Sequence, residues 1–219
     1  MQGTRNGVAM NMSRRTRIFF GWRAVGAAFV LAVLGWGIGF YGPPIYLQTI
    51  QENRGWPVAL ISTAVTTHFV IGAVVVANLP TLQMRFGVPA ATKAGSIFLA
   101  VGVVGWASAT APWQLFVATL FSGASWAAMG AAAVNDIVSP WFVRTRPAAL
   151  SMAHNGASIG GVVFSPLWAA AISVLGFPIA AAAIGVVAIL TTWFSPICYF
   201  RGRLSRWDCG RTVMLCSQL

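Results

Sequence analysis

The stretch AALSMAHNGASIGGVVFSPLWAAAISV, residues 148–174, contains no Asp, Glu, Lys or Arg. A helix needs ~20 mostly apolar residues to cross a bilayer, so the stretch is long enough to span one. It lacks the alternation of apolar and polar residues that marks a strand of a membrane barrel. Because a backbone in lipid must satisfy its hydrogen bonds within the segment, the stretch predicts a transmembrane α-helix.

The rest of the chain repeats this pattern. Of its 219 residues, 58% are hydrophobic and only 8% are charged, whereas a soluble domain carries about 25% charged residues. The sequence therefore predicts an all-α integral membrane protein with a six-helix bundle over residues 20–200, between an N-terminal segment (1–19) and a basic tail (201–219). The predicted spans are residues 21–43, 58–80, 94–111, 113–138, 148–174 and 178–200.

The basic residues are distributed one-sidedly between these spans. Thirteen of the 14 fall in segments on one side, and only Arg54 falls on the other. The positive-inside rule then predicts that both termini are cytoplasmic. Although the net charge is +11, no nucleic-acid partner is expected, because the basic residues are scattered between apolar blocks. The thirteen are Arg5, Arg14, Arg15, Arg17, Arg23, Arg85, Lys93, Arg144, Arg146, Arg201, Arg203, Arg206 and Arg211.

The sequence offers little for catalysis. Of the three acidic residues, only Asp136 is near a predicted span, so a paired-carboxylate mechanism has no second partner. Three cysteines near the end of the chain, Cys198, Cys209 and Cys216, fit no metal-binding spacing. We expect no enzyme activity, no cofactor and no metal site.

The fifth predicted span carries a row of small residues. Gly156 and Gly160 form the small-x-x-x-small pattern that lets two helix backbones approach closely. The pattern has two interpretations, static packing inside the bundle or a rocking contact between two halves of a larger protein. Pro166, further along, is expected to kink the same helix.

His68 lies near the middle of the second predicted span, where an ionisable group is costly and usually faces a cavity or a partner. One interpretation is a neutral imidazole that bonds a Thr hydroxyl or a backbone carbonyl. The other is a role in substrate or proton transfer, because histidine can titrate near neutral pH. We expect His68 to face a central cavity.

Asp136 is predicted to lie at the cytoplasmic end of the fourth span. A carboxylate in a region of low dielectric constant needs a partner. We expect Arg85, Arg144 or Arg146 to pair with it, in either a structural contact or a gate.

Three stretches together resemble the N-terminal half of a major facilitator superfamily transporter, and most of all its bacterial monocarboxylate-porter and oxalate/formate-antiporter-like members. They are FFGWRAVGAAFVLAVLGWGIGFYGPPI (19–45), RGWPVALISTA (54–64) and WFVRTRPAALSMAHNGASIGG (141–161). The resemblance covers roughly residues 20–200. One loop departs from the family pattern G-x-x-x-D-R-x-G-R-R: in PTLQMRFGVP, residues 80–89, Met84 stands in place of the Asp that helps lock the two halves.

The resemblance implies half of a twelve-helix fold that works by alternating access, with helices one and four lining the cavity and helix six facing lipid. The implied protein is a secondary transporter of small organic anions in the bacterial inner membrane, and its partner is a missing C-terminal half or a second copy. The alternative is a truncated, inactive membrane protein or a six-helix scaffold. The substrate-path candidates are His68, Asn155, Tyr41 and Trp36, and the gate or packing candidates are Gly156, Gly160, Asp136, Arg144, Arg146 and Arg85.

Overall fold

The computed structural model describes residues 20–142 and 144–195. This part of the chain is helical and contains no strand. Six segments are long and apolar enough to cross a membrane, so the chain is an all-α, multi-pass membrane protein, as its sequence predicts. The predictions for residues 1–19, for the tail and for the three cysteines lie outside the described residues.

Two of the six spans consist of two helices each. The first joins α1 and α2, and the fourth joins α5 and α6, whereas α3, α4, α7 and α8 each form one span. The helices are α1 (Phe20–Gly39), α2 (Gly42–Arg54), α3 (Val58–Phe86), α4 (Val88–Ser108), α5 (Pro112–Met129), α6 (Ala131–Val138), α7 (Arg146–Leu175) and α8 (Phe177–Phe194), with a 3-10 turn at Ser139–Trp141 before α7.

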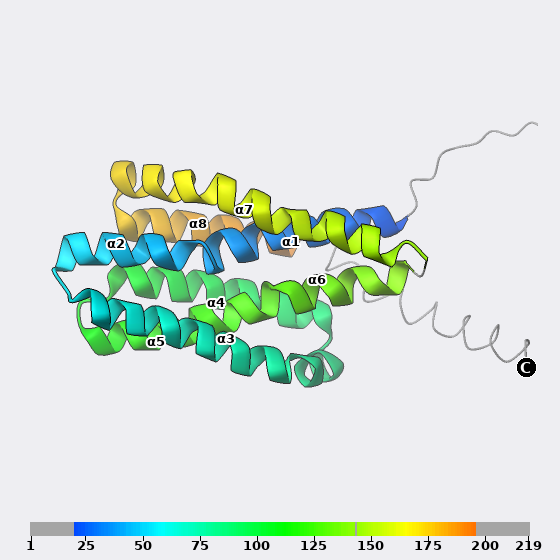
Figure 1. The fold of residues 1–219 in the computed structure, drawn as a ribbon, viewed down its shortest axis with the longest axis horizontal. Coiled ribbons are helices and arrows are strands. Elements are labelled where there is room, and N and C mark those ends of the chain that lie inside the picture. The colour runs from blue at the N-terminus through cyan, green and yellow to red at the C-terminus, as the bar shows by residue number, and fades with distance from the viewer. Residues whose placement is uncertain (1–19, 143, 196–219) are drawn as a thin grey trace, which may run out of the picture.

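The spans run side by side as an elongated bundle (Figure 1). α1 packs along α7, α5 packs between α3 and α4, and α8 covers α4. The first and fourth spans are the most enclosed, since 61% and 56% of their most apolar windows are buried. They are the two spans that the resemblance assigns to the cavity wall.

Short turns connect most of the spans and make sequence neighbours antiparallel. Gly87 is the single residue between α3 and α4, and Gly176 is the single residue between α7 and α8. Both have positive φ values, 85° and 78°, which favour glycine because it has no Cβ.

The turn at Gly87 corrects the prediction of a ten-residue loop at 80–89. α3 continues through Pro80 as far as Phe86, and α4 begins at Val88. A proline inside a membrane-spanning helix removes one backbone donor but does not have to end the helix. Pro80 and the other turn residues of this segment therefore indicate a longer loop than the chain forms.

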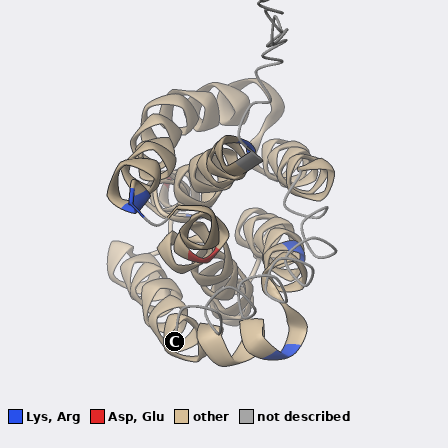
Figure 2. Cartoon of the chain, turned by 90° about the vertical axis from the view of Figure 1, so that its right-hand side faces the viewer, with Lys and Arg blue, Asp and Glu red and all other residues tan. Residues whose placement is uncertain are grey.

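The basic residues mark one end of the bundle. Figure 2 views the molecule from this end, which we call the basic end. Arg54 and Glu52 lie at the opposite end, beside the turn after α2. The structure thus bears out the one-sided arrangement, while the side of the membrane stays a prediction. The described residues that define the basic end are Arg23, Arg85, Lys93, Arg144 and Arg146.

Candidate functional site

The first span is interrupted near its midpoint. The sequence predicts that the first span ends at residue 43, but Gly42, Pro43 and Pro44 begin α2, where a proline needs no helical donor. In a continuous helix, the amide of residue 43 would donate to the carbonyl of Gly39, and Pro43 has no N–H. The break therefore leaves the Gly39 carbonyl without its usual partner in the middle of the bundle.

His68 supplies the missing donor. Its Nε2 lies 3.0 Å from the Gly39 carbonyl oxygen, and its Nδ1 lies 2.8 Å from Ser122 Oγ. Because the carbonyl can only accept, Nε2 carries the hydrogen and Nδ1 accepts from the Ser122 hydroxyl. The same hydroxyl accepts from Trp106 Nε1 at 3.0 Å. The resulting chain runs from Trp106 through Ser122 and His68 to Gly39 and joins four spans.

This geometry corrects the expectation that His68 faces a central cavity. Its side chain is fully buried, and both ring nitrogens are occupied within the bundle. The arrangement matches the interpretation of a neutral imidazole held by a backbone carbonyl, with a serine hydroxyl in place of the threonine hydroxyl that we considered. A substrate or proton role for His68 stays a prediction.

A second polar contact stabilises the same break. The hydroxyl of Tyr46, on α2, donates to the Ile38 carbonyl at 3.3 Å. Tyr46 is itself buried against Trp168 and Trp106, with ring centroids 4.9 Å and 5.9 Å away. Side chains from several helices therefore fix the bend between α1 and α2.

An aromatic cluster lies next to His68, near the middle of three spans. It consists of Trp36 and Phe40 from the first span, Phe69 from α3 and Trp126 from α5. Phe40 lies at the centre, with its ring centroid 5.0 Å from Trp36, 5.6 Å from Phe69 and 6.2 Å from Trp126. Each of the four side chains is partly exposed, so the cluster forms part of the surface of this bundle. Tyr41 continues it, 5.2 Å from Phe40.

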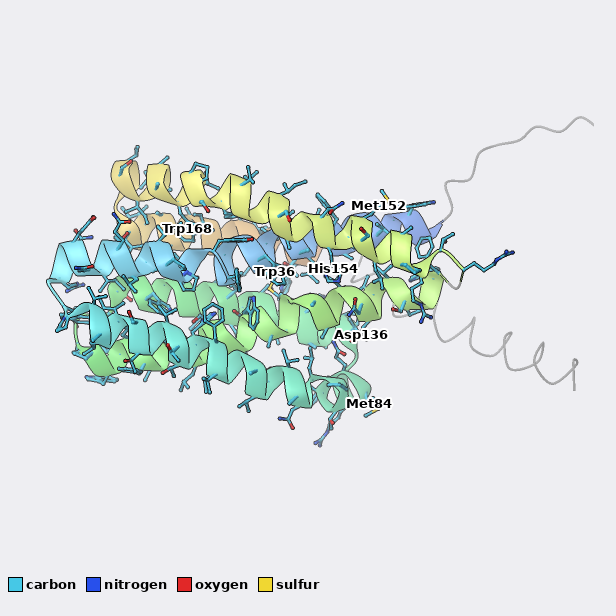
Figure 3. All side chains as sticks on the ribbon, in the orientation of Figure 1. Trp36, Met84, Asp136, Met152, His154 and Trp168 are labelled. Atoms are coloured by element: carbon cyan, nitrogen blue, oxygen red, sulfur yellow. The ribbon has the colours of Figure 1, made fainter. Side chains whose placement is uncertain are left out.

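The two indoles of the aromatic cluster have free donors. Trp36 Nε1 and Trp126 Nε1 are both shielded from solvent and have no hydrogen-bond partner. Trp168 Nε1 also lacks a partner, but its side chain is wholly buried. Trp36 and Trp168 are labelled in Figure 3, Trp36 close to the middle of the bundle. Of these three indoles, those of Trp36 and Trp126 combine an unused donor with a partly exposed ring.

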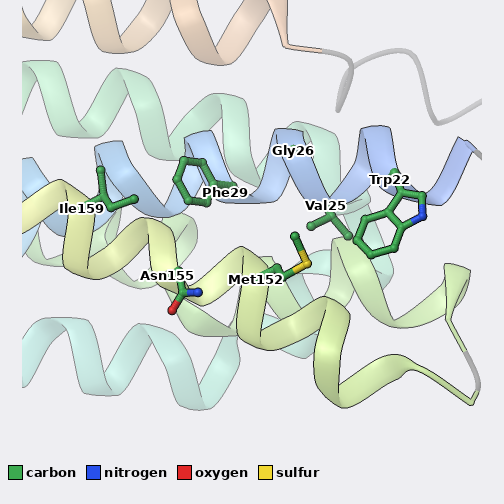
Figure 4. Close-up of a pocket in the computed structure, with 7 residues that line it drawn as sticks. All are labelled: Trp22, Val25, Gly26, Phe29, Met152, Asn155 and Ile159. Carbon is green, nitrogen blue, oxygen red and sulfur yellow. The ribbon is translucent and has the colours of Figure 1, made fainter. Parts of the chain in front are cut away.

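Asn155 lies in a different place from the aromatic cluster. It is exposed in a groove of about 370 Å³ between α1 and α7, shown in Figure 4. Asn155 is the one residue with a polar side-chain amide among the seven that line this groove, and none of the seven belongs to the aromatic cluster. The structure thus brings Trp36 and Tyr41 together and leaves Asn155 apart.

The glycine row of α7 packs inside the bundle. A Cβ on Gly160 would lie 2.6 Å from the Val33 carbonyl oxygen of α1, and one on Gly156 would meet the Phe29 carbonyl. This matches the interpretation of static packing inside the bundle, while a rocking contact with another half stays a prediction. Gly185, in the helix expected to face lipid, is also buried, because a Cβ there would lie 3.0 Å from Ala100 Cβ.

Asp136 does not form the expected ion pair with any described residue. Its carboxylate is exposed beside Gln83, whose amide nitrogen makes no hydrogen bond of ordinary geometry. Arg146 instead donates to the carbonyls of Phe142 and Ser139, at 3.2 Å and 3.4 Å, and so caps the end of the fourth span.

His154 and Arg85 form contacts of their own. His154 Nε2 lies 3.2 Å from Asn135 Oδ1, across α6 and α7, and the Arg85 guanidinium lies 5.5 Å from the ring centroid of Phe86. Arg144 is exposed. Among the described residues, no three His, Cys, Asp or Glu side chains come together as metal ligands.

The sequence interpretation did not single out Phe40, Phe69, Trp126 or Ser122. One signal was available, since Gly39 and Pro43 are four residues apart and this spacing identifies the orphaned carbonyl. No signal in the sequence pairs His68 with Gly39, 29 positions earlier, or with Ser122, 54 positions later.

Comparisons with known proteins add no family assignment. No family model matches the chain, and no curated protein matches it at a significant level.

Proposed function

We propose that this membrane protein is one six-helix half of a secondary transporter of small organic anions, and that the aromatic cluster lines the substrate path. The observation that carries the proposal is the pair of unused indole donors at Trp36 and Trp126, on partly exposed rings near the middle of the first and fourth spans. The resemblance to the major facilitator superfamily also implies that the first and fourth spans line the substrate cavity.

An indole N–H can only donate a hydrogen bond. Leaving such a donor unpaired away from water costs about 1–3 kcal/mol, so a ligand that supplies an acceptor recovers this free energy. A small carboxylate supplies two acceptor oxygens, and the positive edges of the neighbouring rings favour an anion over a cation at their rims. The cluster therefore fits a small anion whose acceptors reach both indoles once the two rings turn to expose their shielded Nε1 atoms.

Alternating access requires two bundles that move about a site between them. The described part of the chain supplies one bundle, and the partly exposed aromatic cluster is the surface that a second bundle would cover. The proposal therefore includes a partner, either a C-terminal half or a second copy of this chain, with both termini in the cytoplasm. It predicts that a single copy of this chain does not catalyse transport.

The binding step can be tested without a partner. Protein carrying ¹⁵N-labelled tryptophan is placed in lipid nanodiscs, and the indole N–H signals are recorded by NMR during titration with acetate, lactate or oxalate. Trp36→Phe and Trp126→Phe identify the two signals, and Trp106, which already bonds Ser122, serves as the internal control. We expect saturable shifts at Trp36 and Trp126 and none at Trp106.

Equal shifts of all indole signals, or none with any of the three anions, would reject the substrate path. The transport step is tested separately by uptake into liposomes that contain the purified chain. Saturable uptake by this chain, with crosslinking to a dimer, would show that the partner is a second copy of the chain and not a C-terminal half.

A further inference from the structure

Another hollow shares no lining residue with the aromatic cluster. It is a groove of about 440 Å³ between α3 and α4, with α5 as its floor, and we call it the α3–α4 groove. All of its lining residues are apolar. Those that matter for the argument are Leu79, Leu82 and Phe86 on α3, Ala94 and Phe98 on α4, and Ala124 on α5.

The residue sizes on the two walls keep the groove open. α3 contributes large side chains, with Leu82 40% and Phe86 51% exposed, whereas α4 faces them mainly with alanines such as Ala91 and Ala94. Both helices pack tightly on α5 and make few contacts with each other. Because Gly87 alone links them at the basic end, they cannot separate further there, and the small residues leave the space between them unfilled.

The dimensions of the groove fit one extended hydrocarbon chain. Its lining begins at Val75 and ends at Phe86 on α3, a length of about 16 Å at ~1.5 Å rise per residue. This length matches half of a hydrocarbon core about 30 Å thick. A packed helix of that length and a diameter of ~10 Å would need roughly 1,200 Å³, more than the groove provides.

The charge at the mouth of the groove selects the headgroup. Arg85 is exposed at the basic end, and its guanidinium lies 5.5 Å from the ring centroid of Phe86, a lining residue. No acidic residue lies in the segment from Val58 to Ser108. We propose that the α3–α4 groove binds one acyl chain of an anionic phospholipid, whose phosphate pairs with Arg85.

The test uses phosphatidylglycerol and phosphatidylcholine that carry a photoactivatable diazirine in one acyl chain. The full-length protein is reconstituted with each lipid, irradiated and digested, and the crosslinked residues are mapped by mass spectrometry. We expect phosphatidylglycerol to label the residues lining the groove, with Ala94→Phe lowering this labelling by more than about tenfold through loss of apolar contact. The matched control is Ala182→Phe, at an exposed position on α8, which should leave the labelling unchanged.

The headgroup is tested in the same experiment. Arg85→Gln should reduce labelling by phosphatidylglycerol about fivefold, the effect of one basic residue near an anionic headgroup, without changing labelling by phosphatidylcholine. Arg54→Gln, at the opposite end, should change neither. Equal labelling of groove and α8 by phosphatidylglycerol, or no effect of Ala94→Phe, would overturn the site. Equal labelling by both lipids in the unchanged protein would overturn its preference for an anion.

Discussion

The bond between His68 and the Gly39 carbonyl makes a quantitative prediction about Pro43. His68→Leu introduces an apolar side chain of similar size and removes both hydrogen bonds. It leaves the Gly39 carbonyl unpaired, at a cost of about 1–3 kcal/mol, and removes one of the two interhelical partners of Ser122, worth about 0.6 kcal/mol. We expect His68→Leu to lower the free energy of unfolding by about 2–4 kcal/mol in total.

Pro43→Ala should relieve most of this cost. The substituted alanine carries the backbone N–H that a helix would direct to the Gly39 carbonyl, so the carbonyl gains a donor that does not depend on His68. In the Pro43→Ala background, His68→Leu should therefore cost at least about 1 kcal/mol less than in the unchanged protein, a coupling well above the ~0.3–0.5 kcal/mol expected of independent sites. Pro44→Ala is the matched control, because it restores the donor to Phe40 and leaves Gly39 as it was.

The assay is equilibrium unfolding in mixed micelles by titration with sodium dodecyl sulfate, followed by circular dichroism. Each single and double variant is measured, together with His68→Gln, whose amide keeps a donor and should cost less than His68→Leu. Additive costs of Pro43→Ala and His68→Leu, or the same coupling with Pro44→Ala, would refute the reasoning that His68 replaces the missing amide.

Three further predictions concern packing, topology and pH. Gly160→Ala should destabilise the bundle by about 1–3 kcal/mol in the same assay, because its Cβ would approach a backbone oxygen at 2.6 Å. Gly26→Ala is the control, since Gly26 has open space around it and the change should have little effect. Equal losses of stability in the two variants would count against close packing at Gly160. In a variant whose native cysteines are removed, an impermeant thiol reagent applied to intact cells should label a cysteine at Asn53 but not one at Thr145, whereas the reverse pattern would invert the topology. The interpretation of His68 as a neutral imidazole predicts that, in an intact two-half transporter, His68→Gln keeps the pH profile of uptake between about 5 and 8, and a flattened profile would support the proton-carrying role instead.

The six spans and the one-sided basic residues are properties that the sequence determines. A bilayer requires a minimum apolar length and hydrogen bonds within each segment, and both conditions can be checked along a single stretch such as residues 148–174. The positions of charges between the spans can be counted in the same way. Proline was less informative, because Pro80 lies inside α3 and Pro43 lies in the first turn of α2.

The partners of individual residues were decided only by the tertiary structure. The small residues of α7 predict a close contact but do not say with which helix, and the structure gives α1. A histidine at mid-membrane needs partners, but which carbonyl and which hydroxyl reach it depends on how α1, α3 and α5 pack. The aromatic cluster likewise forms from three spans far apart in sequence. Local composition sets which segments enter the bilayer, whereas side-chain contacts depend on the rotation and depth of each helix against its neighbours.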